Sequence, residues 1–221
     1  DRDMARLARI QSRTAVGLVL AGGGARGFAH LGIYRALQEE GVEIDCVGGT
    51  SIGSVMAAYV ASDQPLATVM ANAREAFRTN PTGDWSLLPL MSLIKGRRLR
   101  HILHDAVGQL VGFPTQVEDL WKNYYCVATN YSRASEQVVR RGSLVKSLLA
   151  SISIPGALPP AVHEGDLLCD GGTFNNFPVD VMRSSMRGVG TVIGVDLNFR
   201  KPRRIELDDI PTSWALLRDK L

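Results

Sequence analysis

The residues best suited to chemistry in this sequence surround Ser51. Glycines two positions to either side, Gly49 and Gly53, complete a G-x-S-x-G pattern. An apolar run over 44–47 precedes the pattern and apolar residues at helical spacing follow it, so the serine stands at a turn from strand to helix. Small neighbours permit a strained turn that exposes the hydroxyl beside a helix N-terminus, whose dipole favours developing negative charge. The pattern predicts a nucleophilic serine, with an ordinary glycine-rich turn as the alternative.

A serine nucleophile also needs donors for an oxyanion, and a glycine-rich loop offers them. The loop directly follows the apolar run 16–20, so we expect it at the same edge of the sheet as Ser51. The candidate donors are the backbone amides of the consecutive glycines Gly22, Gly23 and Gly24. The loop also matches the dinucleotide fingerprint G-x-G-x-x-G. That fold expects an acid at the end of the second strand, whereas Asp45 lies near its beginning, so nucleotide binding is the weaker alternative.

The base that activates the serine is either an acid or a histidine. Asp170 ends the strand-like stretch 167–169, and Gly171 and Gly172 after it would let a ligand approach closely. Asp170 is therefore the first candidate, although an aspartate that merely opens a turn is the alternative. His163, just past a proline-rich loop, could instead complete a Ser–His–acid arrangement.

Neither a metal site nor a disulfide framework is predicted. His101 and His104 share one helical face, but no second pair of ligands lies near them, and His30 falls within the first helix as a packed residue. The three cysteines, each in or beside a strand-like segment, are Cys46, Cys126 and Cys169. That distribution suits buried reduced thiols.

Composition describes an ordinary globular chain of 221 residues, with 45% hydrophobic and 21% charged residues and a net charge of +3. Positive residues cluster at 97–100, 140–141 and 200–204. Solvated surface is the first interpretation, attraction to an anionic membrane surface the second, and no nucleic-acid partner is predicted. Because no apolar run approaches ~20 residues and no signal peptide is visible, we expect a cytoplasmic protein, with peripheral membrane attachment as the alternative.

The elements that must position these groups alternate between strand and helix. The strand 16–20, a helix that stops at Gly41, the strand 44–47 and the helix after Ser51 predict an α/β fold with a parallel sheet. Later helices are expected over 67–77, 101–110 and 143–150, and later strands over 124–129, 137–140, 167–169 and 191–198. The proline-punctuated apolar segment 80–100 is either a flap that touches lipid or a helical excursion packed on the core.

Four of these stretches occur in one characteristic order. They are Gly22-Gly23-Gly24-Ala25-Arg26-Gly27, Gly49-Thr50-Ser51-Ile52-Gly53, the block from Pro155-Gly156 to Pro159-Pro160, and Asp170-Gly171-Gly172. Together they make most of the chain resemble a patatin-like phospholipase domain. Two further stretches resemble the neuropathy target esterase branch, which acts on lysophospholipids. They are Ala5-Arg6-Leu7-Ala8-Arg9, before the first strand, and Asn176-x-Pro178, after Asp170-Gly171-Gly172.

The resemblance implies a three-layer α/β/α fold with a mostly parallel central sheet, and a Ser–Asp dyad that uses no histidine and no cofactor. Carried over by position, Ser51 is the nucleophile, Asp170 its base and the loop amides the oxyanion hole. The implied reaction is hydrolysis of the acyl ester of (lyso)phospholipids through an acyl-enzyme. Arg26 either holds the loop, attracts a phosphate head group or forms a structural ion pair. The alternative function is a non-catalytic nucleotide- or lipid-binding domain that uses the loop.

The domain organisation that we expect has three parts. Residues 1–14 form a linker or helix, 15–200 the patatin-like catalytic domain, and 201–221 a basic loop and helix packed on the same domain. In the branch that the chain resembles, the catalytic domain often follows cyclic-nucleotide-binding domains, which fits a first residue other than Met. Family sequences also often continue further, so we expect a C-terminus that is trimmed.

Overall fold

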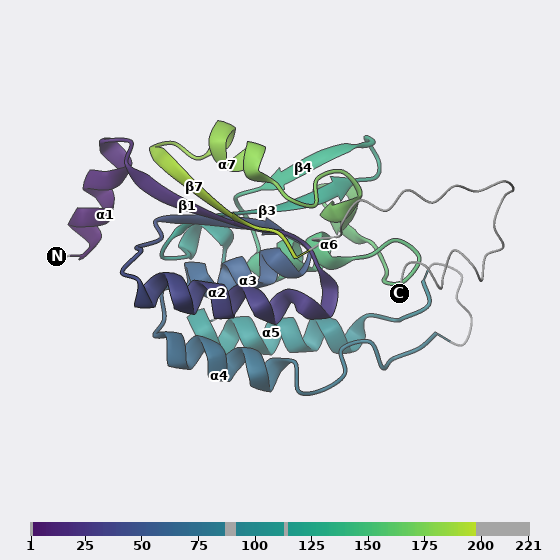
Figure 1. The fold of residues 1–221 in the computed structure, drawn as a ribbon. Coiled ribbons are helices and arrows are strands. Elements are labelled where there is room, and N and C mark those ends of the chain that lie inside the picture. The colour runs from purple at the N-terminus through teal and green to yellow at the C-terminus, as the bar shows by residue number, and fades with distance from the viewer. Residues whose placement is uncertain (1, 87–91, 113–114, 198–221) are drawn as a thin grey trace, which may run out of the picture.

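The computed structural model describes residues 2–86, 92–112 and 115–197, which form a seven-stranded sheet with helices on both faces (Figure 1). The helices are α1 (Arg2–Gln11), α2 (Phe28–Glu39), α3 (Ile52–Ala61), α4 (Leu66–Ala76), α5 (Arg97–Val111), α6 (Leu144–Ile152) and α7 (Val179–Ser185). The strands are β1 (Ala15–Leu20), β2 (Cys46–Thr50), β3 (Asn123–Asn130), β4 (Ser135–Val139), β5 (Ala161–His163), β6 (Asp166–Asp170) and β7 (Val189–Val195). In Figure 1, α7 covers one face of the sheet and α2, α3 and α5 lie on the other, which confirms the three-layer fold.

The sheet has a parallel half and an antiparallel half. Its strand order is β5-β6-β3-β2-β1-β7, and β4 pairs with β3 beside this path. The pairs β7–β1, β1–β2 and β2–β3 are parallel, whereas β3–β4, β3–β6 and β5–β6 are antiparallel. The parallel half contains the alternating strand–helix region that the sequence predicted, and the antiparallel half adds β4, β5 and β6, so the sheet is mixed.

Strand β1 shows why the parallel half is buried on both faces. Leu18 and Leu20 pack in the larger core cluster with α3, while Val19, between them, packs against Met182 of α7. Successive strand residues point to opposite faces, so a continuous apolar run supplies two cores at once.

The structure corrects some element bounds. The second strand begins and ends later than 44–47: β2 includes Gly48 and Gly49, pairs with β3 along its whole length and pairs with β1 from Cys46 to Gly49. A side chain at Gly48 would collide with the ring of Tyr125, so close packing of neighbouring strands outweighs the low strand propensity of glycine. Ser143 stands at the N-cap position of α6, but its side chain makes no capping hydrogen bond.

Two short elements, β5 and α7, are absent from the sequence-based prediction. β5 has three residues and α7 has seven, so neither displays enough of its period to be recognised. The expected C-terminal helix lies outside the described residues, as does most of the apolar stretch within the segment 80–100. The division into 1–14, 15–200 and 201–221 stays a prediction. No helix in the described ranges is both long and apolar enough to cross a membrane.

Side-chain ion pairs hold helix α1 against the sheet. Arg9 donates to both carboxylate oxygens of Asp45, with Nη2 2.7 Å from Oδ1 and Nε 3.0 Å from Oδ2. Asp45 is fully buried and also accepts the backbone N–H of Val16 at 3.0 Å. Asp63 accepts from Arg2, Arg6 and Lys122 at the other end of the helix. Asp45 is thus a structural ion-pair partner that fixes α1 beside β1.

Candidate active site

Ser51 occupies the strained turn between β2 and α3. Its backbone has φ 54° and ψ −131°, in the positive-φ region that non-glycine residues rarely adopt. The turn is held because the Ser51 carbonyl accepts the N–H of Ser54 at 2.9 Å and the Ser54 hydroxyl at 2.6 Å. The Ser51 N–H in turn donates to Ser151 Oγ of α6 at 2.9 Å. The local geometry is that of a nucleophile elbow.

The two glycines of the pattern allow β1 to pass close to this turn. A Cβ on either Gly49 or Gly53 would collide with the carbonyl oxygen of Leu20 at the end of β1. Because both positions lack side chains, the loop after β1 starts directly beside Ser51. The glycines thus position the loop as well as permitting the turn.

Two strand ends that meet head to head bring Asp170 to Ser51. On β3, Val127 pairs with both Thr50 of β2 and Val138 of β4, while Ala128 pairs with both Asp170 of β6 and Gln137 of β4. Since β4 occupies one edge of β3, β2 and β6 share the other edge and run towards each other. Their last residues are therefore adjacent, and Ser51 Oγ donates to Asp170 Oδ2 at 2.6 Å.

Asp170 is a buried carboxylate with neutral partners. Its side chain is 7% exposed, and Oδ1 accepts the N–H of Gly172 at 2.7 Å. Within the described part of the chain, Asp170 has no ion-pair partner. Burial raises the pKa of Asp170 above its ordinary value, and the hydrogen bonds from Ser51 and Gly172 only partly oppose this shift. A carboxylate with a raised pKa is a better base than a solvated one.

The residues after Asp170 let this strand end fit against its neighbours. A Cβ on Gly171 would collide with the carbonyl of Val127, and a Cβ on Gly172 would approach Asp170 Oδ1 to 3.0 Å. Thr129 Oγ1 donates to the Asp170 carbonyl at 2.9 Å, and the Asp170 N–H donates to the Ser153 carbonyl at 2.8 Å. Both sides of the Asp170 backbone are therefore fixed.

The glycine-rich loop lies beside the Ser51–Asp170 pair, but its amides differ in availability. The Gly22 N–H donates to the Asn176 carbonyl at 3.1 Å, so this amide has a protein partner. The amides of Gly23, Gly24 and Ala25 make no hydrogen bond to any residue that the structure describes. Arg26 Nε donates to the Gly23 carbonyl at 3.3 Å.

These groups surround one open cavity of about 360 Å³. Its lining comes from four parts of the chain and consists of Gly22, Gly23, Arg26, Ser51, Ile154, Pro155, Asp170, Gly172, Thr173 and Asn176. No histidine belongs to this lining. Two other cavities on the described protein are larger, but this one holds the Ser51 hydroxyl hydrogen-bonded to the buried Asp170 carboxylate.

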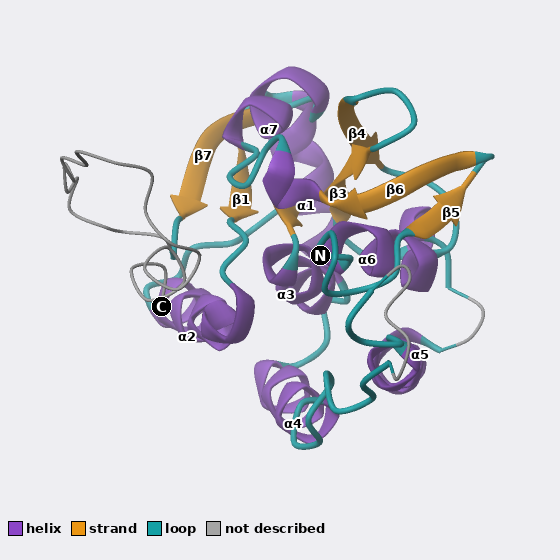
Figure 2. Cartoon of the chain, turned by 90° about the vertical axis from the view of Figure 1, so that its right-hand side faces the viewer, coloured by secondary structure: helices purple, strands orange, loops and turns teal. Residues whose placement is uncertain are grey.

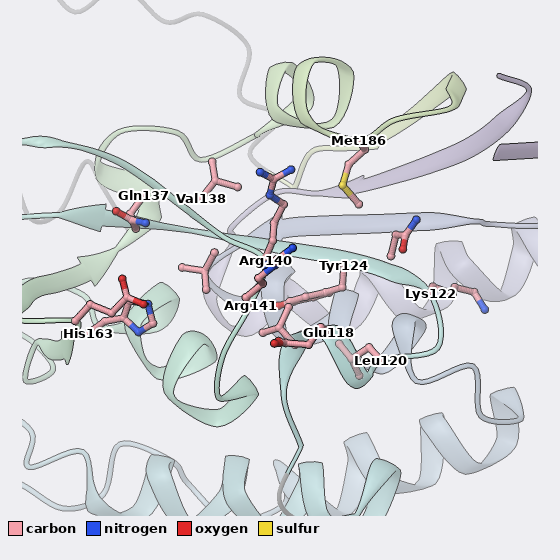
Figure 3. A pocket seen from close by; sticks show the side chains of 14 residues that line it. Glu118, Leu120, Lys122, Tyr124, Gln137, Val138, Arg140, Arg141, His163 and Met186 are labelled. Atoms are coloured by element: carbon pink, nitrogen blue, oxygen red, sulfur yellow. The ribbon is translucent and has the colours of Figure 1, made fainter. Parts of the chain in front are cut away.

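His163 lines a different cavity, of about 560 Å³, whose lining does not include Ser51 or Asp170 (Figure 3). Figure 3 shows His163 at one side of that cavity and Lys122 at the other, with Arg140 and Arg141 between them. The Ser–His–acid alternative is therefore not assembled in this structure.

The remaining candidates have structural roles. His30 is fully buried with Nε2 2.8 Å from the Ala21 carbonyl, and burial lowers its pKa. The three cysteines are free and buried, as predicted. No metal-binding group of three or more ligand side chains occurs in the described ranges. Asp45 precedes β2 and is paired with Arg9, so it does not supply the acid that a dinucleotide-binding fold needs at the end of the second strand.

Sequence reasoning missed the residues that brace the site from a distance. Ser151 accepts the Ser51 N–H and donates to the Val127 carbonyl at 2.6 Å, so it links α6, β3 and the elbow. Asn176 bonds Gly22 through its backbone carbonyl and through Nδ2, which lies 3.3 Å from the Gly22 carbonyl. Asn176 carried a signal, since it follows the glycine pair in the stretch that supported the resemblance. Ser151 carried none, because an isolated helical serine looks like any other.

The chain is similar to several known proteins. The family model described as patatin-like phospholipase matches residues 18–183. Neuropathy target esterase sws of Drosophila melanogaster is 35% identical over 98% of this chain, and lysophospholipase NTE1 of Saccharomyces cerevisiae is 37% identical over 88%. The chain spans only 15% and 11% of these two relatives. The crystal structure of VipD from Legionella pneumophila aligns with a TM-score of 0.48 and 17% identity, over 73% of this chain and 46% of that one.

Proposed function

The chain belongs to the patatin-like phospholipase family, and from that premise we propose that it is a serine esterase that hydrolyses acyl esters of phospholipids, lysophospholipids in particular. The observation that carries the proposal is the 2.6 Å hydrogen bond from Ser51 Oγ to Asp170 Oδ2. A nucleophile and its base within hydrogen-bond reach are the minimum that acyl transfer requires.

In the proposed acylation step, Asp170 takes the Ser51 proton as Oγ attacks the ester carbonyl. The raised pKa of Asp170 supports this role, because a solvated aspartate is a weak base at neutral pH. The Gly172 N–H on Oδ1 leaves Oδ2 directed at the serine. Transfer of the proton to the leaving alkoxide then releases the lysophospholipid's glycerol portion and leaves an acyl ester on Ser51.

The oxyanion that forms during attack needs donors that are already in position. The amides of Gly23, Gly24 and Ala25 are the proposed donors, because none of them is bonded to a described residue. Each well-directed donor contributes about 3 kcal/mol to transition-state stabilisation. Gly22 is proposed to act differently: its hydrogen bonds to Asn176 hold the loop at the correct height above Ser51.

In the proposed deacylation step, Asp170 removes a proton from water as the water attacks the acyl-enzyme. The serine leaves with that proton and the fatty acid is released. No histidine takes part in either step, and no cofactor is required.

The proposed substrate class follows from the relatives, one of which is named a lysophospholipase. The mouth of the cavity suits a lipid, since Ile154, which lines it, is 49% exposed and Phe174, next to the lining residue Thr173, is 53% exposed. We propose that these side chains touch a membrane surface while the substrate enters.

Labelling with a fluorophosphonate tests the proposal most directly. We expect covalent modification of Ser51 in the wild type, and neither labelling nor hydrolysis of lysophosphatidylcholine by Ser51→Ala. His163→Ala is the matched control and keeps both activities, because His163 lies in another cavity. A folded wild-type chain that binds lipid or NAD saturably but is never labelled would instead be a binding domain. Hydrolysis by folded Ser51→Ala would refute the assignment.

A further inference from the structure

A second hollow, of about 580 Å³, lies between α5, α6 and the segment 158–162, next to the Ser51 cavity. Figure 2 shows α5, α6 and β5 as neighbours on one side of the molecule. The hollow and the Ser51 cavity have no lining residue in common. They are separated by the chain from Ile154 to Ala157, whose first two residues face Ser51. The volume of the hollow falls within the range of small-molecule sites.

The walls of this groove are mostly apolar. They include Leu99 from α5, Val145 and Leu149 from α6, and Leu158 from the proline-rich loop. Val145 and Leu149 are four residues apart and thus lie on the same face of α6. A chain of methylene groups laid along such walls would lose contact with water over most of its length.

The polar rim of the groove is cationic and lacks carboxylates. Arg100 on α5 and Lys146 on α6 both line it and are exposed. In the part of the chain that the structure describes, neither side chain has a hydrogen bond or ion pair. No aspartate or glutamate is among the lining residues. Two cations without partners above an apolar groove match a ligand with an anionic head and a single apolar tail.

We propose that this groove binds a long-chain fatty acid, with its carboxylate between Arg100 and Lys146 and its alkyl chain along Val145, Leu149 and Leu158. A zwitterionic lipid fits less well, because its cationic group would find no carboxylate at the rim. The fatty acid is also the product of the proposed hydrolysis, but the groove binds it independently of that reaction, outside the catalytic cavity.

The groove is connected through the backbone to Asp170, the proposed base. Ser153, which lines the groove, accepts the Asp170 N–H through its carbonyl at 2.8 Å. Ile94 and Leu93 also donate to the carbonyls of Ala157 and Gly156 in the intervening segment. An alkyl chain that fills the groove therefore lies beside Ser153, whose carbonyl accepts the Asp170 N–H.

The test measures binding rather than turnover. Isothermal titration with decanoate, below its aggregation concentration, is carried out on the wild type and on Ser51→Ala, so that loss of catalysis does not affect the readout. We expect saturable one-to-one binding to both. Arg100→Gln and Lys146→Gln should each weaken decanoate binding about fivefold, and the double variant roughly 30-fold. Decanol, with the same chain and no charge, should bind the double variant as it binds the wild type.

The control is Arg74→Gln, which changes an exposed arginine on α4 outside the groove and should bind decanoate like the wild type. Three results would overturn the proposal: no saturable decanoate binding, which includes a groove filled by another part of the chain; undiminished binding by the double variant; or equal charge dependence for decyl phosphocholine, which indicates a phospholipid site. Labelling of Ser51 in the same preparation reports separately on the proposed esterase.

Discussion

Two buried aspartates lie at opposite ends of the parallel half of the sheet and have opposite surroundings. Asp45, just before β2, is fully buried and meets the guanidinium of Arg9 through both carboxylate oxygens. Asp170, beyond the other end of β2, is 7% exposed and meets only a hydroxyl and a backbone amide. Burial without a cation raises the pKa of Asp170, whereas both carboxylate oxygens of Asp45 accept hydrogen bonds from the Arg9 guanidinium.

The difference teaches which buried acid can do chemistry. A carboxylate that an arginine holds through both oxygens has no oxygen directed at a nucleophile. A carboxylate whose partners are neutral retains its basicity, at a cost in stability that the rest of the fold must offset. The Asp45 end of the sheet anchors a helix, and the Asp170 end supplies the proposed base.

The sharpest way to break this comparison is to neutralise each aspartate in turn. Asp170→Asn should lower kcat for lysophospholipid hydrolysis by at least about a thousandfold at neutral pH, because the amide cannot accept the serine proton. Asp45→Asn should leave kcat per folded molecule within about threefold, because Asp45 touches only α1 and β1. Comparable kcat losses in the two variants, measured on folded protein, would mean that Asp170 is not a base.

The next largest effect concerns stability at the Asp45 end. Arg9→Met should lower the free energy of unfolding by about 3 kcal/mol in urea titrations, since it leaves the Asp45 charge buried without its partner. Arg35→Met is the matched control. Arg35 pairs with Glu39 on the surface, with both side chains about 60% exposed, so its removal should cost less than about 0.5 kcal/mol. An equal cost for the two variants would contradict the anchoring role.

A methyl group added at the elbow should sharpen the role of the close backbone approach. Gly53→Ala should destabilise the protein by about 2 kcal/mol and lower the esterase rate, because its Cβ would collide with the Leu20 carbonyl. Gly32→Ala on α2 is the control, since its Cβ would meet nothing within 4 Å. That variant should gain up to about 1 kcal/mol from helix propensity. Thermal melts and initial rates measure both, and a neutral Gly53→Ala would refute the packing argument.

The smallest expected effect is a gain in stability when the base is removed. Because the folded pKa of Asp170 is raised above 3.8, its protonated form contributes stability at low pH that is lost as pH rises through the folded pKa. Asp170→Asn stays neutral, so it should exceed the wild type by about 1 kcal/mol at pH 7. The two melting curves should converge towards pH 3. If the variant is less stable than the wild type at pH 7, the charge of Asp170 does not destabilise the folded protein.

Much of the site could be predicted because it depends on local chemistry. The G-x-S-x-G turn, the glycine-rich loop and the aspartate at a strand end each reflect residues within a few positions of one another. Features that depend on residues far apart in the sequence were harder to predict. Strand β2 extends over glycines that propensity alone excludes, and the Gly22 amide, expected among the free donors, is bonded to Asn176. Ser151 braces the elbow from α6, which no pattern near Ser51 indicates.

By itself the sequence determined the alternation of strand and helix, the strained turn at Ser51 and the candidate acid, because turn geometry and periodicity act over short stretches of chain. Only the tertiary structure decided that β6 runs against β3 and meets β2 end to end, so that two residues 119 positions apart share a hydrogen bond. It also decided that His163 belongs to another cavity and that Asp45 is paired while Asp170 is not. These outcomes depend on which strands pair and which side chains lose water, and both follow from packing across the whole sheet.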